Sequence, residues 1–123
     1  MNKFIPKMVS KTWGSETVWA HTPEYVGKLW QILSGHSTNI RYHFSKDETL
    51  HVFSGEGYVD FYTMSEDGDL EHSQHIHVTS GSSIYIPSGK IHKVYAINDM
   101  IVLSATADGL NDIATIKNRN VTK

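Results

Sequence analysis

The sequence predicts a single all-β domain, a sandwich or barrel built from short strands. Apolar runs recur at intervals of about 8–12 residues, and glycine, proline or aspartate separates them. Within residues 38–45, apolar side chains alternate with polar ones, which is the period of a strand with one buried face. No segment keeps a 3.6-residue apolar period over three helical turns. These observations favour strands over helices for nearly the whole chain.

In chain order, the apolar runs predict a series of strands, each bounded by residues that favour turns. The strands are expected at residues 26–33, 38–45, 49–53, 58–64, 70–79, 84–86, 91–97 and 100–105. The turns between them are expected at residues 34–35, 54–57, 66–69, 81 and 87–89. Residues 111–116 fit either a short helix or a strand that covers the barrel. The chain has no internal repeat, linker or low-complexity stretch, so we expect one domain over residues 1–123.

The composition is that of an ordinary globular domain and excludes several classes of function. The chain has 123 residues, of which 39% are hydrophobic and 20% charged, and this length suffices for one core. A net charge of −2 and a pI of about 6.4 argue against a strongly basic face for nucleic acid. There is no cysteine, which excludes disulfides and thiolate catalysis.

The sequence carries no signal for export or for membrane insertion. The first ten residues contain two lysines and no long apolar run, so no signal peptide is expected. No apolar stretch approaches the roughly 20 residues that a bilayer-spanning helix needs. We therefore expect a cytoplasmic protein without a membrane or nucleic-acid partner.

Two segments place candidate metal ligands beside turns. A metal site inside a barrel needs ligands on inward-facing positions of neighbouring strands, and turns fix their direction. The first segment contains His43 and Glu48 and reaches Gly55, the seventh residue after Glu48. The second runs from Gly81 through a proline–glycine turn to His92.

These segments resemble the paired signatures of the cupin superfamily. Residues 81–92 match the pattern G-x5-P-x-G-x2-H without a gap. The first segment matches H-x-H-x3,4-E-x6-G at His43, Glu48 and Gly55, with Ser45 at the second histidine position. The resemblance implies a single cupin barrel, the all-β fold also described as a jelly roll or double-stranded β-helix.

Within that superfamily the chain is similar to the mannose-6-phosphate-isomerase-like cupins. The similarity lies in K-T-W-G-S-E at residues 11–16, Y-V-G-K at residues 25–28 and T-N-I-R-Y-H-F-S-K-D-E-T at residues 38–49. It covers about residues 11–105, which implies a barrel core there, flanked by an N-terminal arm and a C-terminal tail. Arg41 stands where this group usually has glutamine.

The resemblance implies that His43, Glu48 and His92 hold a divalent metal ion. Zinc, manganese, iron and nickel all suit two imidazoles and a carboxylate. The alternative is a metal-free polar network, because buried polar groups can also satisfy one another. Arg41 cannot be a ligand, since its guanidinium stays protonated and has no acceptor. It suits a bidentate contact to a phosphate or carboxylate, with Tyr42 as a second substrate contact.

Lys28 and Lys46 complete the candidate active site as an acid or base. The resemblance implies a metal-dependent isomerase acting on a sugar phosphate. Two other functions stay open at this point. The barrel could bind a small molecule, such as an anionic sugar, without catalysis, or it could be a small metal-dependent oxygenase or lyase. Fold analogy alone does not decide among them.

A second histidine cluster, of His72, His75 and His77, falls within one expected strand. His75 and His77 would share a face of that strand. No acidic or sulfur ligand follows them before Gly81. We therefore interpret all three as surface residues.

An apolar stripe predicts a second subunit. Ile40, Tyr42 and Phe44 would lie opposite the His43 face and point away from the barrel lumen. Either the N-terminal segment or another copy of the chain should cover them. We therefore expect a homodimer, and light scattering that returned the mass of one chain would contradict it.

Overall fold

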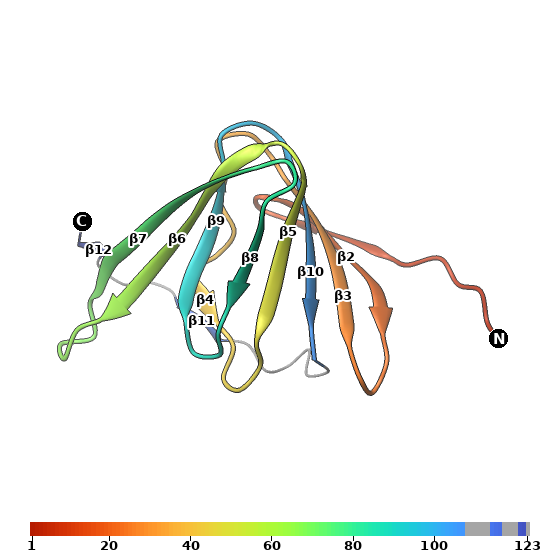
Figure 1. Ribbon diagram of the computed structural model, residues 1–123, viewed down its shortest axis with the longest axis horizontal. Coiled ribbons are helices and arrows are strands. Elements are labelled where there is room, and N and C mark those ends of the chain that lie inside the picture. Colours follow the sequence, from red (N-terminus) through yellow and green to blue (C-terminus); the bar gives the residue numbers. More distant parts are fainter. Residues whose placement is uncertain (108–113, 117–120, 123) are drawn as a thin grey trace.

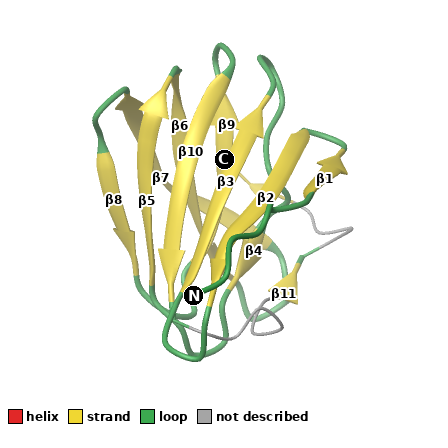
Figure 2. Ribbon diagram, turned by 90° about the vertical axis from the view of Figure 1, so that its right-hand side faces the viewer, coloured by secondary structure: helices red, strands yellow, loops and turns green. Residues whose placement is uncertain are grey.

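Two six-stranded sheets face one another in the computed structural model, which describes residues 1–107, 114–116 and 121–122. Their strand orders are β1-β2-β3-β10-β5-β8 and β11-β4-β9-β6-β7-β12. The strands are β1 (Met8–Lys11), β2 (Gly14–His21), β3 (Val26–Ile32), β4 (Arg41–Tyr42), β5 (Glu48–Ser54), β6 (Glu56–Met64), β7 (Leu70–Thr79), β8 (Ser83–Ile86), β9 (Ile91–Ala96), β10 (Met100–Thr106), β11 (Ala114–Thr115) and β12 (Val121–Thr122). Figure 1 shows β6 and β7 on one side of the molecule and β2 and β3 on the other. In Figure 2 the first sheet spreads from β8 on the left to β1 on the right.

The expected all-β architecture is confirmed, and the differences lie in particular segments. The strand expected at residues 70–79 is β7, whereas β1 and β2 precede the first expected strand. The segment 38–45 joins the sheet as a strand only at β4. Of residues 111–116, residues 111–113 lie outside the described part, and Ala114–Thr115 forms β11 beside β4. Among the residues described, no helix has the length and apolar character needed to span a membrane.

The segment before β4 runs beside β9 without forming a continuous ladder. The Thr38 N–H donates to the Val94 carbonyl at 2.9 Å. The Val94 N–H, however, donates to the Thr38 hydroxyl at 3.0 Å rather than to a backbone carbonyl. Ser37 and Tyr95 form an isolated bridge one residue further along. A side-chain acceptor thus replaces a ladder bond, which is why the alternating pattern does not yield a long strand.

The core lies between the two sheets and continues into the site. Its buried apolar side chains are Trp13, Trp30, Ile32, Leu50, Val52, Val59, Phe61, Val78, Ile86, Val94, Ala96, Met100 and Val102. Every second residue of β5 and β9 points into this core. Glu48 lies on the same face of β5 as Leu50 and Val52, and His92 lies on the same face of β9 as Val94. Both polar side chains therefore enter the same interior.

Gly55 closes the turn between β5 and β6 and cannot carry a side chain there. Its φ of 93° lies in a region that glycine adopts readily and that residues with a side chain rarely adopt. A Cβ at this position would lie 2.3 Å from the Asp99 carbonyl oxygen. The glycine of the first motif therefore allows the β5–β6 corner to pack against the start of β10.

Candidate functional site

His43, Glu48 and His92 converge inside the barrel from three different segments. Glu48 begins β5, His92 lies in β9, and His43 directly follows β4. The backbone pairing of Arg41 with His92 joins β4 to β9 and places His43 near His92. Glu48 Oε1 lies 3.4 Å from His43 Nε2 and 3.6 Å from His92 Nε2. All three side chains are buried.

The hydrogen bonds around this cluster determine which atoms of His92 and Glu48 are left as acceptors. His92 Nδ1 lies 2.8 Å from the Lys90 carbonyl oxygen, so Nδ1 carries the proton. The Ser104 hydroxyl donates to Glu48 Oε2 at 2.5 Å. Glu48 Oε1 and His92 Nε2 are both buried and accept no hydrogen bond from the described residues. Two acceptors that face each other in this way need a shared cation or proton between them.

This arrangement fits a divalent metal ion. Histidines that bind metals usually donate their other ring N–H to a carbonyl or carboxylate, as His92 does to Lys90. A set of two imidazoles and one carboxylate suits zinc, iron, manganese or nickel. His43, Glu48 and His92 would hold the ion, and Ser104 would orient the carboxylate from the other side.

Glu48 is held as a carboxylate. Burial alone would raise its pKa. A proton shared with the ring nitrogens of His43 and His92, the charge of Arg41 and the hydrogen bond from Ser104 together outweigh burial. The pKa of Glu48 therefore lies well below its ordinary value. An ionised carboxylate is the form that a metal ligand requires.

A cavity of about 260 Å³ is linked to this cluster through Arg41, which lines the cavity and acts electrostatically on Glu48, whereas the three candidate ligands do not line it. It is lined by Lys11, Trp13, Glu16, Lys28, Asn39, Arg41 and Thr115. Arg41 is buried, its guanidinium carbon lies 4.3 Å from the centre of the Trp30 ring, and its Nε has no partner among the described residues. Lys28 Nζ lies 3.8 Å from Glu16 Oε1, which also accepts a 2.9 Å hydrogen bond from Trp30 Nε1.

Burial also acts on the two cations of this cavity. It lowers the pKa of Arg41, and Glu48 and Glu16 only partly offset that effect. It lowers the pKa of Lys28 as well, where Glu16 opposes the shift and Arg41 adds to it. Lys28 is therefore closer to a neutral amine than an exposed lysine is.

The lowered pKa of Lys28 predicts a pH-dependent contribution to stability. Between the folded and the unfolded pKa the unfolded chain binds more protons, so folding stability rises with pH in that window. Relative to Lys28→Met, the wild type should gain melting temperature as the pH rises towards the ordinary lysine pKa of about 10.4. Thermal melts of both proteins test this, with Lys3→Met removing the same charge from an exposed position. A difference that stays flat or falls would contradict it.

Tyr42 and Lys46 lie apart from the residues that line the cavity. Tyr42 is half-buried on the opposite side of β4 from Arg41, and its ring meets Phe44 edge-on at 5.3 Å. Lys46 is half-buried in the connection between β4 and β5. Their roles as substrate contact and as acid or base stay predictions.

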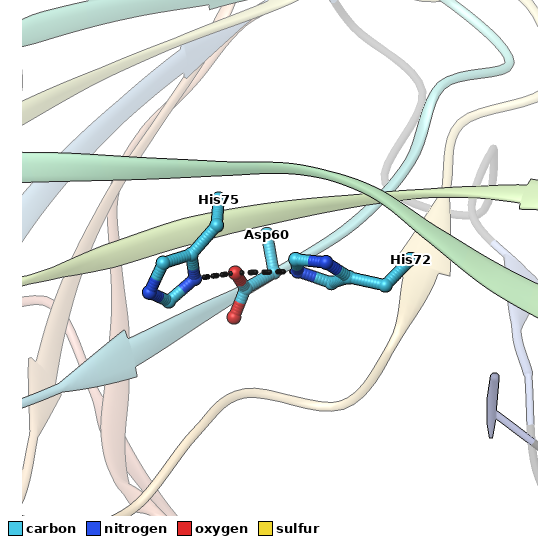
Figure 3. Close-up of side chains that lie close together, drawn as sticks. All are labelled: Asp60, His72 and His75. Atoms are coloured by element: carbon cyan, nitrogen blue, oxygen red, sulfur yellow. Dashed lines mark hydrogen bonds and ion pairs between the residues drawn. The ribbon is translucent and has the colours of Figure 1, made fainter. Parts of the chain in front are cut away.

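A second group of potential metal ligands lies on the outer face of the sheet that contains β6 and β7 (Figure 3). Asp60 of β6 lies between His72 and His75 of β7, and one ligand atom from each falls within 4.8 Å of the others. The expectation that these histidines lie at the surface is confirmed, since the side chains of His75 and His77 are about half exposed. The expectation that they have no acidic partner was wrong, because the neighbouring strand β6 supplies Asp60. His75 and His77 share a face of β7, as expected, and the Tyr58 ring contacts both. His77, however, pairs with Glu56 rather than with Asp60.

Comparison with known proteins identifies a family. The family model described as Cupin matches residues 35–121, well over half of the chain. No match was found among curated proteins. Both signature segments identified from the sequence fall within the matched residues.

Several solved structures have the same fold at low sequence identity. CapF, a capsular polysaccharide assembling protein from Staphylococcus aureus, has a TM-score of 0.74 and 18% identity over 93% of this chain and 32% of CapF. A variant of Bacillus subtilis oxalate decarboxylase has a TM-score of 0.74 and 17% identity over 90% of this chain and 30% of that protein. KdgF from Halomonas sp. has a TM-score of 0.69 and 16% identity over 86% of this chain and 91% of KdgF. The chain thus spans about a third of the length of CapF and oxalate decarboxylase.

Proposed function

The chain belongs to the cupin family, and from that premise we propose that it binds a divalent metal ion and a small anionic molecule at the mouth of its barrel. The observation that carries the proposal is the facing pair of buried acceptors, Glu48 Oε1 and His92 Nε2, at 3.6 Å. A cation between them would relieve the repulsion of their lone pairs and satisfy both atoms.

The charges around the cavity support an anionic ligand. Arg41 and Lys28 supply two positive charges, and Glu16 and Glu48 supply two negative ones, so the metal-free site is balanced. A divalent ion at Glu48 would leave an excess of two positive charges in a poorly solvated space. A phosphate or a dicarboxylate would neutralise that excess. Arg41 would bind it, because its Nε has no partner among the described residues.

Isomerisation of a sugar phosphate is the finer form of this proposal. A bound metal ion would supply Lewis-acid polarisation of a carbonyl or hydroxyl oxygen. Arg41 would hold the phosphate, and Lys28, with its lowered pKa, would move a proton between adjacent carbons. A substrate that raises the melting temperature without being converted would favour a binding protein. Oxygen consumption by the iron-loaded protein would favour an oxygenase.

Metal content is the direct test of the site. We expect purified wild type to hold about one more equivalent of metal than His92→Ala, because the substitution removes a buried ligand. Elemental mass spectrometry after incubation with zinc, manganese, iron or nickel measures this difference. His51→Ala is the control, since His51 contacts Ser83 on the outer side of β5. Equal metal in wild type and His92→Ala would contradict the proposed site.

The homodimer also remains part of the proposal. Phe44 at the β4–β5 connection is 60% exposed, and Phe4 and Ile5 of the N-terminal arm are 62% and 89% exposed. In Figure 1 the arm extends away from the barrel. Apolar side chains that are this accessible favour burial against a second copy.

A further inference from the structure

We propose that Asp60, His72 and His75 form a zinc site on the outer face of the sheet that contains β6 and β7. His72 Nε2 lies 3.0 Å from Asp60 Oδ1, and His75 Nδ1 contacts the same oxygen from the other side. Figure 3 shows the two rings on either side of the carboxylate. The site faces away from the barrel interior, so it is independent of the site formed by His43, Glu48 and His92.

A β-bulge creates this convergence. Asp60 is paired with His75, and Tyr62 with His72, while the register shifts between Phe61 and Tyr62. One extra residue of β7 is therefore accommodated between His72 and His75. Without it, residues three apart would point to opposite faces of the strand. With it, both histidines share the face of Asp60, which is the way bulges commonly redirect side chains at sites.

Neighbouring aromatic rings hold both imidazoles in place. The His75 ring stacks on Tyr58 with a centroid separation of 3.8 Å and an interplanar angle of 20°. The His72 ring meets Tyr62 edge-on at 5.4 Å. Asp60 itself is only 6% exposed, so its carboxylate is fixed at the base of the group. Oriented ligands lose less conformational entropy when they bind a metal.

The surroundings leave space for a further ligand. A cavity of about 330 Å³ is lined by the three residues together with Tyr62 and Lys93. Lys93 lies directly opposite Asp60 on β9. Two histidines and a carboxylate with an open fourth position are the ligand set of many catalytic zinc sites. Water or a small anion would take that position, and the Lys93 ammonium favours the anion.

The alternative is that the two histidines only hydrogen-bond to Asp60. Zinc binding to metal-free protein separates the two cases, with equivalents measured by calorimetry and by elemental mass spectrometry after dialysis. The test variant is His72→Gln/His75→Gln, since glutamine keeps a donor that can reach Asp60. Loss of a residue that only hydrogen-bonds to a metal ligand weakens metal binding by about 10–100-fold. Loss of the two histidine ligands themselves should therefore weaken zinc binding at least about 100-fold. His77→Gln, in the same strand and paired with Glu56, should bind zinc like the wild type.

The count of zinc equivalents distinguishes this site from the one inside the barrel. Two equivalents in the wild type and one in the double variant would support both sites. One in the wild type and none in the variant would support the outer site alone. An equal count and equal affinity in both proteins would overturn the outer site. Circular dichroism confirms that the double variant is folded, and the single variants His72→Gln and His75→Gln provide the same comparison if it is not.

Discussion

Glu48→Gln is expected to lower the free energy of unfolding of the metal-free protein by about 3–5 kcal/mol, because it removes one partner of a buried charge network. Glu48 is 1% exposed and offsets the buried Arg41. Glutamine has nearly the same shape and can still accept the Ser104 hydrogen bond, but it lacks the charge that offsets Arg41. Its amide can also donate to His92 Nε2, and this contact would reduce the loss. Urea unfolding of both proteins at pH 7 with a chelator present measures the difference.

The pH dependence of this difference follows from the lowered pKa of Glu48. A carboxylate with a depressed folded pKa stabilises the protein fully above its unfolded pKa of about 4.3. The difference between wild type and Glu48→Gln should therefore hold from pH 7 down to about pH 4.3. Below that it should shrink as the pH falls towards the folded pKa. A difference that grew on acidification would contradict the assignment of Glu48 as a carboxylate.

Glu56→Gln is the matched control for this substitution. Glu56 also contacts a histidine, His77, at 2.6 Å, but both side chains are well exposed. Exposed ion pairs contribute about 0–1 kcal/mol, because water solvates both partners in the unfolded and folded states. If Glu56→Gln cost as much as Glu48→Gln, burial would not be the source of the effect.

The strands that the sequence predicts best are those with the clearest contrast between core and solvent. In β5 and β9, buried residues alternate with more exposed ones, and residues 49–53 and 91–97 were expected there. In β2, by contrast, most side chains are half-buried on both faces, which leaves no apolar period to detect. The segment before β4 alternates well, but the Thr38 hydroxyl replaces a backbone acceptor, and sequence periodicity carries no information about that.

The two clusters of potential metal ligands differ in whether the sequence alone can reveal them. His43, Glu48 and His92 are selected by the resemblance to the two cupin signatures, which also include Gly55, Gly81 and Pro87. The outer cluster depends on a register shift between β6 and β7 that spacing does not reveal. Its carboxylate, Asp60, lies twelve residues before His72 and carries no motif. The available clue in the sequence was the occurrence of three histidines, at residues 72, 75 and 77, within one expected strand.

Trp30→Ala is expected to lower the free energy of unfolding by about 3–5 kcal/mol, the usual range for truncating a buried tryptophan. Trp30 is fully buried, and its ring meets Trp13 at 6.3 Å in an edge-on contact. Trp19→Ala is the control, since Trp19 is 47% exposed and covers Gly27 from outside. We expect it to cost about 1 kcal/mol, because about half of the ring is already in water.

Trp30→Phe separates the packing role of Trp30 from its role at the cavity. Phenylalanine fills most of the core space but cannot donate to Glu16, as Trp30 Nε1 does at 2.9 Å. A hydrogen bond to a charged group is worth about 1.5–3 kcal/mol, which is the expected loss in stability. The smaller ring also supports Arg41 less well, so calorimetry should show weaker phosphate binding than in the wild type. Unchanged phosphate affinity, with stability lowered as expected, would mean that Arg41 does not depend on Trp30 to bind an anion.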